Sequence, residues 1–512
     1  MQHVSVGVGP LSEADVVGVA RDGVGVELDA GARAAIAASR SVVSALAADA
    51  EPHYGISTGF GALATKHIPV EQRAVLQRSL IRSHAAGSGP EVEREVVRAM
   101  MLLRLSTLAT GHTGVRPQTA AVLAGMLDAG ITPVVHEYGS LGCSGDLAPL
   151  AHVALVLIGE GTARDRLGAL GQSADLLRAH GLEPVTLAEK EGLALINGTD
   201  GMLGQLLLAC HDLDLLLRTA DITAAMSVEA MLGTARVFAA DLQALRPQPG
   251  QAVAAANMRA LLADSPIIAS HAGPECVYVQ DAYSMRCAPQ VAGAARDTLA
   301  HARQVGAFEL RASVDNPVVI DGRVESNGNF HGAPIAYVLD FLAIPAADVA
   351  SMSERRTDRM LDASRSRGLP AFLAHDPGVD SGHMIAQYTQ AALVSEMKRL
   401  AVPASVDSIP SSAMQEDHVS MGWAAARKLR RSVDALTRVL AIEALTAARA
   451  LDLRVPLRPG RPTEAVVAAL REKVSGPGPD RHLAPEIDAA VDFVRSGAAV
   501  AAADDALAAP LS

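Results

Sequence analysis

The sequence predicts a mainly α fold, in which a long central helical bundle follows a smaller, mixed N-terminal part. Only 3% of the residues are aromatic, so Ala, Leu and Val must fill the core, and such a core favours closely packed helices. Apolar residues also recur with helical periodicity over most of the chain. Short strand-like stretches, residues 4–8 and 24–28, alternate with helices only within the first 50 residues.

Six stretches carry the helical pattern most clearly. Residues 92–108 form a broad apolar stripe that is typical of a buried helix. Residues 418–451 contain no Pro and only Gly422, so one continuous helix there would run about 50 Å. A helix this long, apolar on most sides, belongs inside a bundle. The other four stretches are residues 118–129, 198–239, 291–310 and 333–352.

Helix starts and loops divide the chain into parts. Ser12 and Asp29 are expected to be N-caps, and Asp146 is expected to cap a helix over residues 147–157. Residues 454–485 carry several Pro and Gly residues and look like a less regular connection. We therefore divide the chain into an N-terminal part, a long-helix bundle, and a C-terminal connection with a helical tail. Their boundaries are residues 1–197, 198–453 and 454–512.

Composition excludes several classes of protein. The formal charge of −12 is spread along the chain, which argues against a nucleic-acid partner and against an anionic membrane surface. No stretch looks long and clean enough to span a bilayer, and no export signal is visible. No HExxH or CxxC spacing indicates a metal site. Four cysteines without such pairs suggest reduced thiols and a cytoplasmic protein: Cys143, Cys210, Cys276 and Cys287.

The loop at residues 139–149 allows two interpretations. By composition it is a flexible turn followed by a helix cap. Its chemistry suggests more, because a strained Ser-Gly turn can place the Gly145 nitrogen against the carbonyl carbon of Cys143. Loss of two waters would then leave a five-membered ring with an exocyclic methylidene from Ser144. Such a ring is an electrophile that no ordinary side chain supplies.

Residues 139–152, GSLGCSGDLAPLAH, closely resemble the signature of the aromatic amino acid ammonia-lyases, a family that makes a methylidene-imidazolone group autocatalytically. The resemblance continues in order along nearly the whole chain, and the last matching segment is especially similar to the histidine-specific branch. The other matching segments are residues 54–61 (the family's inner lid loop), 191–199, 279–287, 327–332 and 411–421.

The resemblance implies a self-made prosthetic group, methylidene-imidazolone, from Cys143, Ser144 and Gly145, with no exogenous cofactor. One residue departs from the family pattern, because the first ring-forming residue is usually Ala and here is Cys143. Cyclisation uses backbone atoms, so we still expect the ring to form, with the thiol as a substituent. The family also implies a homotetramer whose active sites combine loops from three chains.

By the same resemblance, each site residue has a functional role beside a plain structural one. Tyr54 is expected to remove the substrate β-proton, although it could simply fill a loop. Tyr283 is expected to assist proton handling, and Arg286 to bind the substrate carboxylate as a two-pronged donor. The remaining residues are Asn197 and Gln280, which are expected to bond the prosthetic group and the substrate, and Phe330, which is expected to form a wall of the site.

Substrate choice depends on Ser83, His84 and Glu416. In the family, Ser-His at this place is similar to the histidine enzymes, and Glu416 adds to this as both a binding and a catalytic residue. A buried carboxylate would cost several kcal/mol beside a phenyl ring, which cannot pair with it. The resemblance thus implies non-oxidative deamination of L-histidine to trans-urocanate and ammonia, the first step of histidine degradation.

Three alternatives remain open at this point. A tyrosine or phenylalanine ammonia-lyase and a 2,3-aminomutase of the same family would share the electrophile. Residues 55–59 also match the G-x-S-x-G pattern of serine hydrolases, with Ser57 as the nucleophile. That motif needs an apolar strand before it and a helix after it, and residues 50–54 make a poor strand, so this alternative is disfavoured.

Overall fold

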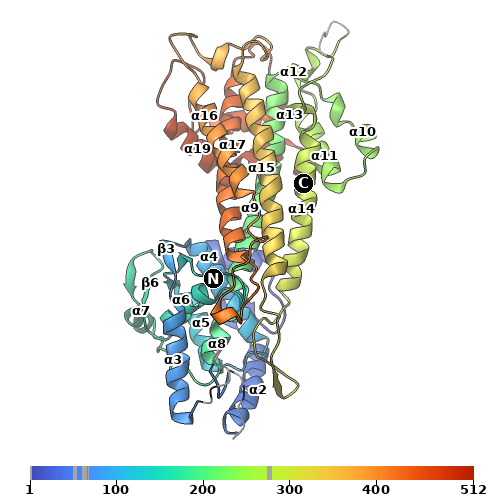
Figure 1. Cartoon of the computed structure of the whole chain (residues 1–512). Helices are drawn as coiled ribbons and strands as arrows, with labels where there is room; N and C mark the ends of the chain where they lie inside the picture. The colour runs from blue at the N-terminus through green and yellow to red at the C-terminus, as the bar shows by residue number, and fades with distance from the viewer. Residues whose placement is uncertain (1–2, 50–52, 54, 60–65, 67, 274–278) are drawn as a thin grey trace. The chain divides into compact units, whose positions relative to one another are not determined.

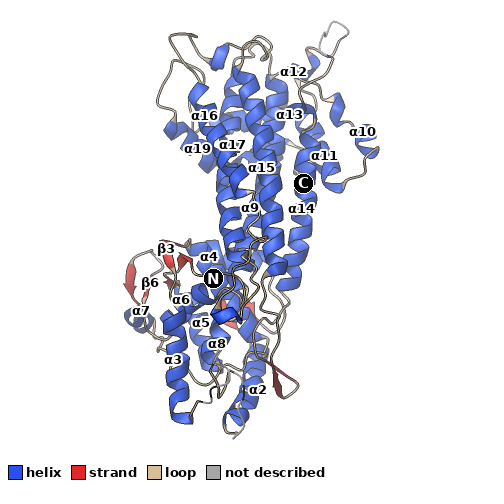
Figure 2. Cartoon of the chain, viewed as in Figure 1, coloured by secondary structure: helices blue, strands red, loops and turns tan. Residues whose placement is uncertain are grey.

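The computed structural model spans the chain, and it describes all residues except 1–2, 50–52, 54, 60–65, 67 and 274–278. The fold is 60% helical. Figure 2 shows the helices together with a few short strands. The prediction of a mainly α fold is therefore confirmed.

The chain forms two compact units, each assembled from three separate segments. The first unit contains Met1–His211, Arg303–Asp340 and Pro403–Arg427. The second unit contains Asp212–Ala302, Phe341–Val402 and Lys428–Ser512. Each unit thus draws together segments that are far apart in sequence, and the three-part division of the sequence stays a prediction.

Up to residue 200 the elements are short strands mixed with helices of up to 18 residues. They are β1 (His3–Val6), α1 (Glu13–Val17), η1 (Gly18–Asp22), β2 (Gly25–Leu28), α2 (Ala30–Ala47), η3 (Val70–Gln72), α3 (Arg73–His84), β3 (Ser88–Glu91), α4 (Arg94–Ala109), α5 (Pro117–Ala129), β4 (Thr132–Pro133), β5 (His136–Tyr138), α6 (Leu147–Leu157), β6 (Thr162–Arg164), β7 (Leu170–Gln172), α7 (Ser173–Ala179) and α8 (Glu191–Ile196).

Long helices dominate the rest of the chain (Figure 1). The elements are α9 (Asp200–Ala230), η4 (Arg236–Phe238), α10 (Ala240–Ala244), α11 (Pro249–Leu262), α12 (Pro266–Ala269), α13 (Tyr283–Arg286), α14 (Ala288–Glu309), β8 (Val318–Ile320), β9 (Arg323–Glu325), α15 (Ala333–Leu361), η5 (Ala371–Leu373), α16 (Met384–Leu400), η6 (Ser412–Met414), α17 (Gly422–Asp452), α18 (Arg461–Arg471), α19 (Ala484–Arg495) and α20 (Ala498–Ala506).

Local signals placed several of these elements correctly. Ser12 forms a full capping box with Asp15, and the Asp29 side chain accepts a hydrogen bond from Ala32 N. β1 and β2 pair in parallel, close to the two predicted strands. The expected helix over residues 198–239 ends earlier, at Ala230, where α9 gives way to a turn. Sequence patterns thus located the elements more reliably than their ends.

The first unit has α4 at its centre. Every residue of this helix from Val96 to Ala109 is buried. Two of these buried residues, Arg98 and Arg104, are arginines, and their guanidinium groups donate to backbone carbonyls of neighbouring elements. All the strands that the structure describes also belong to this unit and form four small sheets.

The long helices of the second unit are joined by a buried ion pair. Arg356 of α15 contacts Glu443 of α17 in a bidentate arrangement, with N–O distances of 2.5 and 2.8 Å. Ser227 of α9 donates to the same carboxylate at 2.8 Å. Arg356 also donates to the carbonyl of Ser284, in the short helix α13, at 3.0 Å. One buried carboxylate therefore links three long helices and supports α13.

Two helical stretches, Glu191–Ala230 and Ala333–Leu361, are long and apolar enough to cross a membrane when judged by length and composition alone. The sequence predicted no such stretch, so by this criterion that expectation is wrong. Their apolar windows are 100% and 61% buried inside the structure, respectively. Buried core helices pass the same test, so the two stretches are weak support for a membrane-bound protein.

We expect Glu443→Ala to lower the free energy of unfolding by about 3–5 kcal/mol, because it leaves the Arg356 charge buried without its partner. Glu464, paired with Arg458 on the surface, is the matched control, and Glu464→Ala should cost about 1 kcal/mol or less. Urea unfolding followed by circular dichroism measures both changes. Equal losses for the two variants would contradict this assignment.

Candidate active site

The loop between β5 and α6 makes a close contact with the segment that follows α8. Gly145 has φ +78°, and a Cβ atom at this position would lie 2.1 Å from the carbonyl oxygen of Gly198. The backbone N–H of Asp146 donates to the same oxygen at 2.7 Å. Only glycine fits at position 145, because both the backbone conformation and the space exclude a side chain.

Asn197 ends α8 and contacts the same loop. Its Nδ2 donates to the carbonyl oxygen of Ser144 at 2.8 Å, and its own Oδ1 is buried without a hydrogen-bond partner. A hydrogen bond donated to this carbonyl oxygen draws electron density from the carbonyl carbon and from any double bond conjugated to it. These residues therefore fit a methylidene-imidazolone formed from residues 143–145, in which the Ser144 carbonyl would be conjugated to the methylidene.

Glu416 receives three hydrogen bonds from neighbouring side chains. Its Oε1 accepts from Ser144 Oγ at 3.1 Å, and its Oε2 accepts from Cys143 Sγ at 3.1 Å and Ser411 Oγ at 3.0 Å. Burial, together with the neighbouring Glu416 carboxylate, raises the pKa of Cys143 to about 12. The Cys143 thiol thus stays protonated at neutral pH, and protonated thiols are poor nucleophiles.

His84 is the last residue of α3. Its Nδ1 donates to the carbonyl oxygen of Leu80 at 2.9 Å, and Ser83 Oγ donates to the same oxygen at 3.0 Å. Burial lowers the pKa of His84 below its usual value, although the Leu80 carbonyl and Glu416 oppose this shift. The neutral ring with its proton on Nδ1 leaves Nε2 as a hydrogen-bond acceptor.

Two cavities meet at Ser144 and Glu416, and Asn316 also borders both. The first has a volume of about 430 Å³, and the predicted site residues around it are Ser83, His84, Ser144, Asn197 and Glu416. The second, also about 430 Å³, is lined by Cys143 and Phe330 besides Ser144 and Glu416. The first unit thus brings together predicted residues from five separate parts of the sequence.

Asp146 does not act as expected. It precedes α6, but its side chain makes no capping hydrogen bond, so that prediction is wrong. The fully buried carboxylate instead accepts from Ser140 Oγ at 2.8 Å and from Met202 N at 2.9 Å. Burial raises the pKa of Asp146 to about 7, and these two donors only partly offset it. Asp146 therefore ties the loop of residues 139–146, the candidate prosthetic-group loop, to the start of α9.

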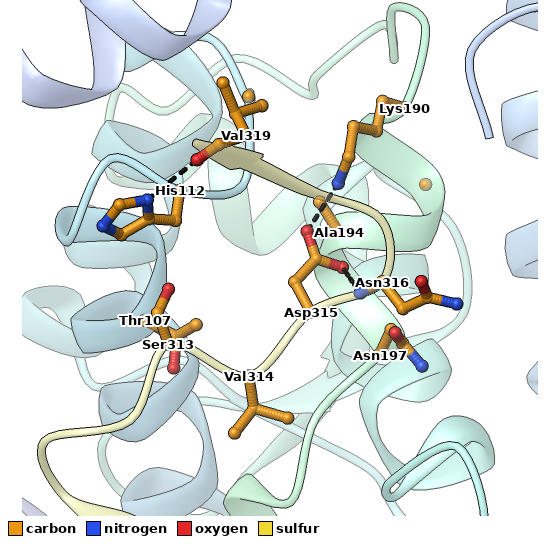
Figure 3. A network of polar contacts seen from close by, with 12 residues as sticks. Thr107, His112, Lys190, Ala194, Asn197, Ser313, Val314, Asp315, Asn316 and Val319 are labelled. Carbon is orange, nitrogen blue, oxygen red and sulfur yellow. Dashed lines mark hydrogen bonds and ion pairs between the residues drawn. The ribbon is translucent and has the colours of Figure 1, made fainter. Parts of the chain in front are cut away.

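A buried polar network includes residues next to Asn316, which borders both cavities (Figure 3). Lys190 Nζ contacts Asp315 Oδ2 at 2.5 Å, and both side chains are fully buried. The other carboxylate oxygen of Asp315 accepts from the backbone N–H of Asn316 at 2.8 Å. The pair holds the start of α8 against the stretch that presents Asn316 to both cavities.

Four other predicted residues do not belong to the described part of the first unit. Gln280, Tyr283 and Arg286 belong to the second unit, and Tyr54 lies outside the described residues. The Tyr283 side chain is 70% exposed, and the Arg286 guanidinium lies over its ring, 4.7 Å from the centroid. The first and last residues of the short helix α13 therefore contact each other.

Several residues that shape the site were not foreseen. Asn316 carried one weak signal, its position in a polar, glycine-bearing stretch before Pro317. Ser411 lies within a motif that was recognised for other residues. Arg104 and Lys190 carried no signal, because in a sequence a charged residue in a helical stretch looks like a solvated one.

Alternative chemistries find little support. Among the described residues, no group of three or more His, Cys, Asp or Glu side chains could hold a metal ion. Ser57 is fully buried, and its Oγ accepts a hydrogen bond from the backbone N–H of His53. The described residues around it form a turn and an isolated bridge, whereas a hydrolase nucleophile needs a strand before it and a helix after it.

The fold and the site define a class of protein. A mainly α chain places a Ser-Gly loop, a carbonyl donor and a carboxylate around one cavity, and a sequence profile of the aromatic amino acid lyases matches residues 11–472. The chain belongs to the aromatic amino acid lyase family.

Individual relatives narrow the comparison. The chain is 65% identical to the histidine ammonia-lyase of Streptomyces avermitilis over 506 residues, covering 98% of this chain and 99% of the relative. It is 50% identical to the histidine ammonia-lyase of Sorangium cellulosum, with 97% of this chain and 98% of the relative covered. Two solved structures, each 38% identical and covering 99% of this chain, share the fold. The first is a tyrosine aminomutase from Streptomyces globisporus, with a TM-score of 0.94 and 100% of its own chain covered. The second is a histidine ammonia-lyase from Trypanosoma cruzi, with a TM-score of 0.91 and 96% of its own chain covered.

The raised pKa of Asp146 makes a testable contribution to stability. Its pKa increases from 3.8 to about 7 on folding, so the group contributes stability that is fully present below pH 3.8 and lost as the pH rises towards 7. The unfolding free energy of the wild type minus that of Asp146→Asn should therefore fall over this pH range. Denaturant unfolding at several pH values measures the difference, and a difference that is constant or rises with pH would contradict the assignment.

Proposed function

We propose that this chain eliminates ammonia from L-histidine to give trans-urocanate, the first step of histidine degradation. One observation carries the proposal: Ser144, Asn197, His84 and Glu416 border a single cavity. The names and identities of the histidine ammonia-lyase relatives agree with it. A methylidene-imidazolone from residues 143–145 would supply an electrophilic carbon that makes the amino group a better leaving group.

Recognition of an imidazole ring follows from two acceptors. His84 offers Nε2, because its Nδ1 proton is already used by Leu80 O, and Glu416 offers carboxylate oxygens. An imidazole N–H can donate to either acceptor, and a protonated ring can donate to both. A phenyl ring has no N–H to donate to either acceptor, so it would displace water from the half-buried carboxylate without replacing the lost hydrogen bonds. We therefore assign Ser83, His84 and Glu416 to substrate binding, and Glu416 also to proton handling.

The remaining roles are proposals for residues outside this group. Tyr54 would remove the β-proton, and Tyr283 would assist proton handling. Arg286 would bind the substrate carboxylate, because its planar fork matches two oxygens. Gln280 would bond the substrate, and Phe330, which borders the second cavity, would form a wall.

We also propose a homotetramer whose active sites combine loops from three chains. Gln280, Tyr283 and Arg286 belong to a different compact unit from Ser144. The side chains of Gln280 and Tyr283 are exposed, so they are available to another copy of the chain. The cytoplasm remains our proposal for the location of the enzyme.

Product analysis tests the proposed reaction. The purified protein is incubated separately with L-His, L-Tyr and L-Phe, and we expect urocanate from L-His alone. Ser144→Ala should abolish the activity, whereas Ser41→Ala, on the exposed face of α2, should not change it. A β-amino acid product would move the chain to the aminomutases, and near wild-type activity of Ser144→Ala would end the proposed mechanism.

Glu416→Gln tests the pocket. Replacing the carboxylate by an amide weakens its hydrogen bonds, and we expect kcat/KM for L-histidine to fall roughly ten- to a hundredfold. Glu464→Gln, a surface change in the second unit, serves as the control and should leave kcat/KM unchanged. An unchanged kcat/KM in Glu416→Gln would show that this carboxylate does not recognise the substrate.

A further inference from the structure

We propose that the buried Arg104 is a positioning residue for ring formation at residues 143–145. It would act by holding the Asn197–Gly198 backbone against the Ser144–Gly145 turn. This inference rests on the proposed function, because it assumes that the ring forms.

Arg104 is fully buried in α4 and contacts four acceptors around the end of α8. It donates to the carbonyl oxygens of Ala194 at 3.1 Å, Asn197 at 3.0 Å and Val314 at 2.9 Å. It also contacts Asp200, with N–O distances of 3.2 and 3.4 Å. The last carbonyls of a helix have no partner within the helix, so a cation at this end satisfies them and favours the local dipole.

The segment held by Arg104 is the segment that contacts the prosthetic-group loop. Asn197 Nδ2 donates to Ser144 O at 2.8 Å, and Gly198 O accepts from Asp146 N at 2.7 Å. A Cβ atom at Gly198 would lie 2.5 Å from Arg104 Nη2, and one at Gly145 would lie 2.1 Å from Gly198 O. Gly198 is therefore confined between the guanidinium on one side and the turn on the other.

The buried charges around Arg104 comprise two cations and two carboxylates, which compensate one another. Arg104 and Lys190 face the carboxylates Asp200 and Asp315, and all four side chains are at least 95% buried. Asp200 thus compensates the positive charge of Arg104, while the remaining N–H groups of the guanidinium donate to backbone carbonyls and fix their positions. The other buried arginine of α4, Arg98, instead donates to Val19 O and Leu127 O, far in sequence from the loop.

Ring closure needs the confinement that Arg104 provides. A bond forms between Gly145 N and the carbonyl carbon of Cys143, and the carbonyl oxygen leaves as water with the amide hydrogens of Ser144 and Gly145. The Ser144 hydroxyl then leaves with the Cα hydrogen as a second water, so no oxidant is required. A peptide nitrogen is a weak nucleophile, and the reaction depends on holding it against the carbonyl carbon.

Intact mass under denaturing conditions reads ring formation directly, as the loss of two waters, without an activity assay. We expect the wild type and Arg98→Met to have lost both waters. For Arg104→Met we expect dehydration to slow by about two orders of magnitude. The reason is that the substitution should displace the reacting groups by about 1 Å, and a displacement of this size costs about that much in rate. Most of that variant should then keep both waters while its circular dichroism remains helical. Complete dehydration of Arg104→Met would overturn the inference alone.

Conservative variants keep the test valid if Arg104→Met fails to fold. Lysine keeps the charge but cannot reach all four acceptors from one ammonium group, so Arg104→Lys should dehydrate more slowly than Arg98→Lys in a time course after synthesis. Equal rates for the two variants would overturn the inference. A wild type that keeps both waters would overturn the proposed function, and this inference with it.

Discussion

The site depends on the contact between two backbone segments, residues 144–146 and 197–198. Gly145 and Gly198 meet at a distance that no side chain would permit, and the N–H of Asp146 bonds directly to Gly198 O. This contact brings the Asn197 side chain within hydrogen-bond distance of the Ser144 carbonyl oxygen. The packing of α4, α8 and the loop before α6 is thus the scaffold on which the proposed electrophile is made.

Buried charged groups lie close to this contact. Arg104 and Lys190 face Asp200 and Asp315, and Asp146 lies beside the loop with a pKa raised to about 7. Hydrophobic residues could fill the same volume at lower desolvation cost. What the charged groups add is donors and acceptors for backbone atoms at helix ends, which apolar side chains cannot satisfy.

We propose that substrate choice depends on His84 and Glu416, which border the first cavity. His84 presents an acceptor because Leu80 fixes its proton, and Glu416 is oriented by Cys143 and Ser411. Cys143 is the one residue of the proposed ring-forming triplet that departs from the family pattern. Its thiol donates to Glu416, the carboxylate that we assign to substrate binding. Its buried, protonated thiol makes it a poor nucleophile, so its contact with Glu416 is its main effect on the site.

The sequence by itself determined the helical class and the positions of the long helices that it predicted, and it pointed to the triplet that we propose forms the ring, because periodicity and a long local motif are encoded in neighbouring residues. Ser83, His84 and Glu416 were also identified from motifs, although their meeting around Ser144 depends on the fold. Only the tertiary structure decided the roles of Arg104 and Asp146. A charged residue in a sequence looks solvated, and only burial against specific carbonyls and amides reveals it as part of a core.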